Sequence, residues 1–183
     1  MEDSKSQKIK KIPLKHAYKL LGHGPTVLIS SRDGVTDNLC SVSWIMPFDF
    51  DPPLIGAVIE RTHKTFDNIC KNKECIINIP VIDQLDIVKK MGTISGHKKD
   101  KTKGLSLQTG YHVSCKRLEG CCAWIEARFK KHKATDDFDL MIFEVLDVYA
   151  PKDTLTKKFT IDINKCPTIH HLGGMDFCTI KKI

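Results

Sequence analysis

The chain has 183 residues, of which 41% are hydrophobic and 28% charged, and its formal net charge is +7. This composition is typical of one globular domain, residues 1–183, and excludes a disordered chain, a collagen and a coiled coil. The longest apolar stretches, such as Cys75–Ile82, fall well short of the ~20 residues of a membrane helix. The charged start, MEDSKSQKIKK, has no apolar core, so we expect no secretory signal, no membrane span and a cytoplasmic location.

Strand patterns dominate the predicted elements. In chain order, the predicted strands are Thr26–Ser31, Leu39–Phe48, Leu54–Ile59, Cys75–Ile79, Gly120–Phe129 and Phe138–Val148. Asp33-Gly34 marks a turn after the first strand, and Pro47 should end the second. A polar turn is expected at Thr135–Asp137.

Two helices are predicted between these strands. Thr62–Asn72 should have Thr62 as its N-cap and bury Phe66, Ile69 and Cys70, and Asp83–Met91 should bury Leu85, Val88 and Met91. The segments Gly92–Gly110 and Cys166–Cys178 are expected to form loops. Short strands outnumber helices, which favours a mainly β fold with added helices and an antiparallel barrel.

The usual catalytic and metal motifs are absent from the sequence. No G-x-G-x-x-G, Walker loop, G-x-S-x-G or H-E-x-x-H pattern occurs, which excludes most simple hydrolases and kinases. The spacing of the eight cysteines does not suit zinc, so we expect no metal and interpret most of them as reduced core residues. Cys40 is either a buried inert thiol or a redox participant.

Two segments point to an anionic, aromatic ligand. Arg61, His63 and Lys64 crowd the start of a predicted helix, where the macrodipole is already positive. A bound phosphate would offset that repulsion; alternatively, the side chains extend into water. Along Asn38–Trp44, small polar residues alternate with apolar ones, so Ser41 and Ser43 either hydrogen-bond a flat heterocycle or form the wet face of an edge strand.

Four ordered pieces of the chain, between about residues 20 and 178, resemble the flavin reductase-like, FMN-binding split-barrel family, which includes flavoredoxin and archaeal ferric reductase. The pieces are Val27–Gly34 with Asn38-x-x-Ser41-x-Ser43-Trp44; Phe50–Leu54 with Arg61-x-x-Lys64-Thr65; Gly92-Thr93-x-Ser95-Gly96-x-x-x-Asp100-Lys101; and Pro167-x-x-His170-His171-Leu172-Gly173-Gly174-x-x-Phe177.

The resemblance implies a six-stranded Greek-key split β-barrel that works as a homodimer with FMN near the subunit interface. It assigns Asn38, Ser41, Val42 and Ser43 to the isoalloxazine and ribityl chain, and Arg61, Lys64 and Thr65 to the phosphate. It places Thr93, Ser95, Gly96 and Lys101 over the flavin or phosphate, and His171 close to the ring. No catalytic side chain is expected, because the flavin carries the chemistry. Trp44 either borders the flavin or is a core residue at a dimer contact.

The implied activity is a flavin-dependent oxidoreductase that takes hydride from NADH or NADPH and reduces flavin, a ferric chelate or a redox partner. An electron carrier without a pyridine-nucleotide site is the alternative. Thr102 departs from the family, which commonly has an aromatic residue there, and the basic segment His97–Lys103 either attracts an anionic partner such as NADPH or is solvated. A basic barrel binding single-stranded nucleic acid is disfavoured, because aromatic residues do not interleave with the lysines.

Overall fold

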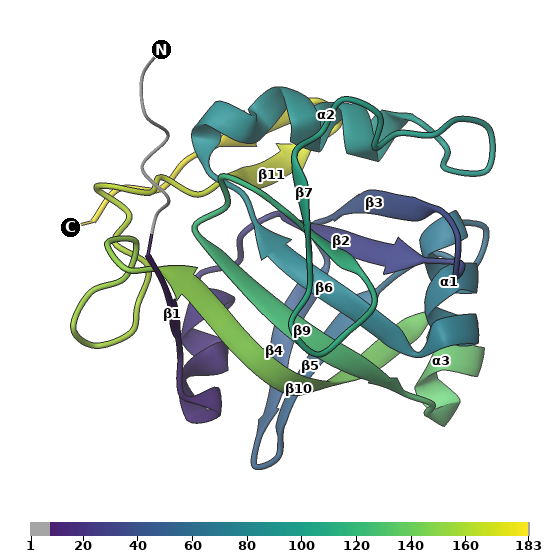
Figure 1. The fold of residues 1–183 in the computed structure, drawn as a ribbon, viewed down its shortest axis with the longest axis horizontal. Helices are drawn as coiled ribbons and strands as arrows, with labels where there is room; N and C mark the ends of the chain where they lie inside the picture. Colours follow the sequence, from purple (N-terminus) through teal and green to yellow (C-terminus); the bar gives the residue numbers. More distant parts are fainter. Residues whose placement is uncertain (1–7, 183) are drawn as a thin grey trace.

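The computed structural model describes residues 8–182, so residues 1–7 of the charged start lie outside the described part of the chain. A single eight-stranded antiparallel sheet dominates the structure (Figure 1). Its strands are β1 (Ile9–Lys11), β2 (Val27–Arg32), β3 (Asp37–Val42), β4 (Ile45–Phe50), β5 (Pro53–Val58), β6 (Glu74–Ile79), β9 (Ala123–Lys130) and β10 (Leu140–Pro151). The mainly β prediction is therefore confirmed, with eight strands where the resemblance implied six.

The strand order closes the sheet into a split barrel. The order is β3-β2-β6-β9-β10-β5-β4, with β1 added beside β10, so β3 and β4 lie at opposite ends of the path. Only Ser43 and Trp44 separate these two strands in the chain, and three Cα–Cα steps span at most about 11 Å. The two edges of the sheet must therefore come together at Ser43 and Trp44, which we call the seam. The Val58 amide donates to the Trp44 carbonyl at 2.9 Å, which continues the β4–β5 pairing up to the seam.

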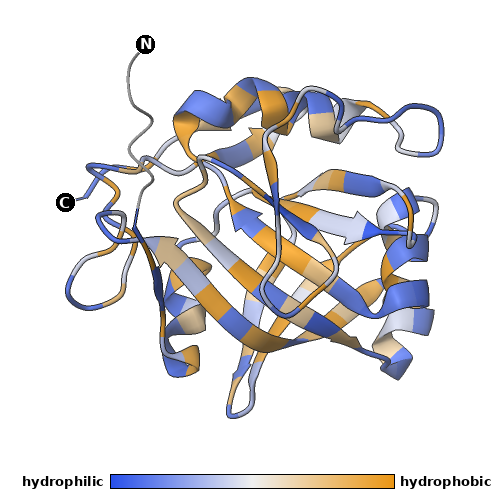
Figure 2. Cartoon of the chain, in the orientation of Figure 1, coloured by the Kyte–Doolittle hydropathy of each residue, from blue (hydrophilic) through white to orange (hydrophobic). Residues whose placement is uncertain are grey.

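Period-two alternation along the strands separates two hydrophobic cores. In β6, Ile77 points into the barrel interior and Ile76 into a second core outside it. In β9, Ile125 and Trp124 divide in the same way. Apolar colouring accordingly concentrates on the strands, whereas the loop after α2 is mainly hydrophilic (Figure 2). Both faces of this part of the sheet are therefore buried, one inside the barrel and the other beneath the second core.

The helices cover the barrel. They are α1 (Lys64–Asn72), α2 (Leu85–Thr93) and α3 (Lys133–Phe138), with 3₁₀ segments η1 (Leu14–Leu20) and η2 (Ile82–Gln84). Ile69 of α1 belongs to the barrel core, while Val88 and Met91 of α2 belong to the outer one. Ile69, Val88 and Met91 are buried as predicted, whereas Phe66, Cys70 and Leu85 are half-buried against the same cores. The N-cap of α1 is His63 rather than Thr62, whose hydroxyl instead donates to the Glu60 carboxylate at 2.9 Å.

Several predicted boundaries are wrong. The single strand Leu39–Phe48 is two strands, and Pro47 lies inside β4, where an edge position needs no donor from it. The expected polar turn at Thr135–Asp137 belongs to helix α3, which ends at Asp139 with φ of 56°. The expected loop Gly92–Gly110 contains strand β7 (Leu107–Thr109), which pairs with β8 (Lys116–Leu118) just beyond it. The expected loop Cys166–Cys178 contains the hairpin of β11 (His170–Gly173) and β12 (Asp176–Cys178).

Within residues 8–182, no helix combines the length and the apolar character needed to cross a bilayer.

Candidate functional site

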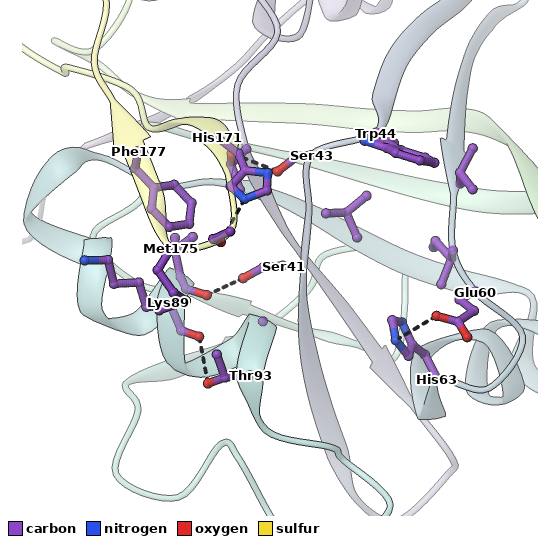
Figure 3. A pocket seen from close by; sticks show the side chains of 17 residues that line it. Ser41, Ser43, Trp44, Glu60, His63, Lys89, Thr93, His171, Met175 and Phe177 are labelled. Carbon is purple, nitrogen blue, oxygen red and sulfur yellow. Dashed lines mark hydrogen bonds and ion pairs between the residues drawn. The ribbon is translucent and has the colours of Figure 1, made fainter.

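A cavity of about 490 Å³ opens at the seam (Figure 3). Its size lies within the ~300–1,000 Å³ of small-molecule sites. The ends of β3 and β5, helix α2 and the β11–β12 hairpin form its walls, so it exists because the sheet edges do not pair fully at this point. Its residues are Thr26, Ser41, Val42, Ser43, Trp44, Val58, Ile59, Glu60, His63, Val88, Lys89, Gly92, Thr93, His171, Gly174, Met175 and Phe177.

Two serines at the end of β3 differ in what they offer a ligand. The Ser41 hydroxyl donates to the Val88 carbonyl of α2 at 2.5 Å, so it faces the cavity only as an acceptor. The Ser43 hydroxyl lies 3.1 Å from the Thr26 hydroxyl, and either oxygen can be the donor. One hydrogen of this pair is used between the two residues, which leaves the other for a ligand. Ser43 and Thr26 thus form the hydroxyl donor of this wall.

The β11–β12 hairpin brings His171 to the opposite wall of the cavity. Its Nε2 lies 3.1 Å from the Gly174 carbonyl, and its ring packs against Phe177 with centroids 5.1 Å apart. A carbonyl only accepts hydrogen bonds, so Nε2 carries a hydrogen. Met175 and Phe177 beside it make this wall largely apolar. A flat, partly apolar ring system therefore suits the space between hairpin and sheet.

A second cavity of about 180 Å³ adjoins the first, and the two share His63, Gly92 and Thr93. It lies between the start of α1, the end of α2 and the loop that follows. Its lining is Asn38, Cys40, His63, Lys64, Thr65, Met91, Gly92, Thr93, Ile94, Ser95, Gly96 and Lys101. The first-turn amides of α1 have no partner inside the helix, and they favour an anion at this end.

Lys101 is the most informative side chain of the smaller cavity. It is only 5% exposed, and its ammonium donates to the Met91 carbonyl at 3.0 Å. Among residues 8–182, no carboxylate lies within ion-pair distance of it. Burial lowers the pKa of Lys101. A buried ammonium is costly unless an anion compensates it, so this cavity is suited to a negatively charged group.

Two other predicted cations are already engaged. The Lys64 ammonium lies 3.3 Å from the Asp33 carboxylate and donates to the Thr36 hydroxyl at 2.9 Å, although its side chain still lines the smaller cavity. The Arg61 guanidinium donates to Asp139 at 2.7 Å and to the Asp136 carbonyl at 3.0 Å. Arg61 lines neither cavity, so its phosphate role stays a prediction that would require release from Asp139.

The structure brings the other predicted site residues together around the joined cavities. These are Asn38, Ser41, Val42, Ser43, Lys64, Thr65, Thr93, Ser95, Gly96, Lys101 and His171. Sequence reasoning missed the walls supplied by Val58, Val88 and Met175, because they reach the cavity through packing and no local motif marks them. Trp44 borders the larger cavity and is 74% exposed, so it does not belong to the core.

Within the described part of the chain, no three His, Cys, Asp or Glu side chains are grouped so as to hold a metal ion.

Known proteins resemble this chain in sequence and in structure. The uncharacterized protein YddH of Escherichia coli K12 is 32% identical over 178 residues, covering 93% of this chain and 94% of its own. An FMN-binding domain of a flavin reductases-like enzyme from Shewanella baltica has a TM-score of 0.91 at 26% identity, covering 97% and 96% of the two chains.

Flavoredoxin of Desulfovibrio vulgaris shares the fold, with a TM-score of 0.79 at 21% identity over 87% of this chain and 88% of its own. The sequence profile of the flavin reductase like domain matches residues 21–175. The chain therefore belongs to the flavin reductase like domain family.

Proposed function

We propose that this protein is an FMN-binding flavoprotein that transfers electrons, oxidising NADH or NADPH to reduce flavin, a ferric chelate or a redox partner in the cytoplasm. The observation that carries the proposal is the pair of joined cavities, one with apolar walls and hydroxyl groups and the other with a buried cation. This arrangement fits a heterocycle with an anionic tail. When bound, the flavin would supply the hydride and electron chemistry.

The chain's own residues would bind and orient that ligand. Val42, Val58 and Phe177 would pack against the ring system, while the Ser43–Thr26 hydroxyls would hydrogen-bond its edge. Lys101 and the start of α1, with Thr65, would hold the phosphate. Thr93, which lines both cavities, would lie between the two parts.

The first test is retention of FMN. The purified protein is mixed with FMN, desalted, and its visible absorption spectrum recorded. We expect wild type to keep the flavin and Lys101→Met to bind it about tenfold to a hundredfold more weakly, because a charge-assisted hydrogen bond contributes about 1.5–3 kcal/mol.

The matched control is Lys98→Met, an exposed residue of the same loop, which should bind FMN as wild type does. A wild-type protein that stays colourless and shows no saturable FMN binding would contradict the proposal. Equal losses in the two variants would remove Lys101 from the site.

The electron donor is decided by a second assay on the loaded protein. Oxidation of NADH or NADPH with turnover, in the presence of excess flavin or ferric chelate, supports the reductase function. The alternative is a carrier like the flavoredoxin that shares the fold. A bound flavin that dithionite reduces but neither pyridine nucleotide reduces would identify the carrier.

A further inference from the structure

One cysteine lies among cations. Cys40 of β3 is 7% exposed and lines the smaller cavity with His63 and Lys101. His63, Thr65 and Lys101 line the same cavity as its sulfur, and the Lys101 charge acts on the thiol from the loop after α2. His63 is in turn held by Glu60, whose carboxylate lies 3.7 Å from Nε2. Cys40, His63 and Lys101 thus share the wall of one cavity, with Glu60 beside His63.

The electrostatic setting of Cys40 differs from that of the other buried thiols. Burial acts to raise its pKa, but the neighbouring His63 and the charge of Lys101 act in the opposite direction, and the pKa of Cys40 lies below its ordinary value. The same pairing raises the pKa of His63. Elsewhere burial raises the thiol pKa, at Cys70, Cys75, Cys115, Cys121, Cys122 and Cys166.

Two elements contribute the cations that face this thiol. His63 comes from the N-cap of α1 and Lys101 from the loop after α2. Lys64 lines the same cavity, but its ammonium is paired with Asp33. In the neutral form the thiol hydrogen can donate to the Ser41 carbonyl, at a long 3.6 Å. The positive charges of Lys101 and of protonated His63 favour the thiolate.

We propose that Cys40 is a modification site: a nucleophilic thiolate that small electrophiles and hydrogen peroxide reach through the cavity, and whose modification prevents an anion from binding to the same cations. The proposal rests on the cluster and the cavity, independently of which cofactor binds. It assigns to Cys40 the reactivity expected of a partly accessible thiol in a positive environment.

The reactions balance with groups already in place. With iodoacetamide, the sulfur forms a bond to the CH₂ carbon and iodide leaves. With hydrogen peroxide, the sulfur attacks one oxygen, the O–O bond breaks, and the hydroxide that leaves takes the proton of the His63 imidazolium. The products are a sulfenic acid, water and neutral His63, and a thiol reductant reverses this oxidation.

Competition with anions follows from the shared cations. A phosphate at Lys101 and a thiolate at Cys40 need the same positive charges, and each therefore weakens the other. A bound phosphate group should protect Cys40, and a modified Cys40 should weaken phosphate binding. The sulfenic or alkylated side chain also occupies part of a cavity of only about 180 Å³.

The test measures alkylation rates at each cysteine by peptide mass spectrometry, with limiting iodoacetamide at pH 7. We expect Cys40 to react faster than Cys70 and Cys178, although both of these are more exposed. A brief exposure to hydrogen peroxide should add one oxygen atom at Cys40 first, and dithiothreitol should remove it. Faster reaction at Cys70 and Cys178 would overturn the proposal.

Variants identify the groups that activate the thiol. His63→Asn and Lys101→Met should each move the midpoint of the pH–rate profile of Cys40 upward, and lower its rate at pH 7 about threefold per pH unit of that shift. His97→Asn, whose ring lies near Asp67, is the matched control and should leave the profile unchanged. A profile unaltered in both variants would contradict the proposed activation.

Ligand protection is measured on wild type, so it does not depend on any variant folding. Inorganic phosphate should slow alkylation of Cys40 several-fold and leave Cys70 unaffected; an unchanged rate at Cys40 would refute the competition. Fast alkylation of Cys40 in a protein that fails to retain FMN would support the reactive thiol while contradicting the proposed function, so the two failures are distinguishable.

Discussion

At the candidate site, Gly96 has no space for a side chain. The Asn38 amide donates to the hydroxyls of Ser31, at 3.2 Å, and Thr65, at 2.9 Å, which directs its carbonyl oxygen toward Gly96. A Cβ atom at Gly96 would overlap that oxygen. Asn38 is 4% exposed and hydrogen-bonded, so the loop must move instead.

We therefore expect Gly96→Ala to weaken FMN binding at least about tenfold and to reduce the free energy of unfolding by about 1–2 kcal/mol. Fluorescence titration with FMN and urea unfolding measure the two quantities. Gly92→Ala is the steric control for stability, because its Cβ would lie 3.6 Å from Cβ of Ser41, an ordinary contact. Unchanged FMN affinity in Gly96→Ala would show that this loop does not shape the site.

At the scale of elements, two histidines connect the β11–β12 hairpin to the segment before β2. His23 Nε2 lies 3.1 Å from the Thr168 hydroxyl, which lies 3.0 Å from His170 Nε2. Burial lowers the pKa of His23 to about 4, with a smaller effect of His170, and burial also lowers the pKa of His170. Both rings are neutral in the folded protein at pH 7.

The pH dependence of stability follows from these shifts. Between about pH 6.5 and pH 4 the unfolded chain binds more protons than the folded one, so the free energy of unfolding falls as the pH falls through this window. We expect His23 to account for about 1–2 kcal/mol of that loss, since solvent screens part of its ring. Urea unfolding at pH 7.5 and pH 5 should show a smaller difference for His23→Gln than for wild type or for His97→Gln. Equal differences in the three proteins would refute the assignment.

The elements also show what the sequence can predict. Strands β2, β5 and β6 follow from local patterns of apolar residues. The buried face of α2 follows in the same way, because Val88 and Met91 are three positions apart, and Ile69 marks that of α1. The break between β3 and β4 does not, because it depends on where the opposite edge of the sheet lies. The β11–β12 hairpin could not be predicted for the same reason. Glycine-rich segments of this kind are typical of loops, and their pairing depends on long-range contacts.

The candidate site divides in the same way. Ser41, Ser43 and Thr65 belong to short motifs that carry their own hydrogen-bonding chemistry, so the sequence alone could place them at one site. Val88 and Met175 are ordinary apolar residues whose position in the wall depends on how α2 and the hairpin pack against the sheet. The ion pair of Arg61 with Asp139 could not be predicted from local patterns either, because the two residues lie 78 positions apart in the chain.

At the scale of the whole molecule, the edge strand β4 presents an apolar strip. Trp44, at its entry, Met46, Phe48 and Phe50 are 74%, 48%, 47% and 67% exposed and recur at every second position. An exposed apolar edge is a template for association. We propose that a second copy of the chain covers this strip and thereby the mouth of the cavity beside Trp44.

The variant Phe48→Lys should therefore convert a dimer into a monomer, as measured by light scattering coupled to size exclusion, since it places a charge in the centre of the strip. Val35→Lys, at an 81% exposed position on the β2–β3 turn, is the control and should remain dimeric. A wild-type protein that is monomeric at all accessible concentrations would contradict this arrangement.

The seam has one further consequence. The residues around the larger cavity range from Thr26 to Phe177, so the site exists only when the first strands, α2 and the last hairpin have all reached their places. No shorter fragment contains these walls, and cofactor loading therefore reports completed folding of nearly the entire chain. Because such a ligand binds the folded state alone, it adds about 2.7 kcal/mol to stability at a hundred times its Kd. The bound ligand thus contributes part of the stability that a fully closed sheet would gain from hydrogen bonds between its own strands.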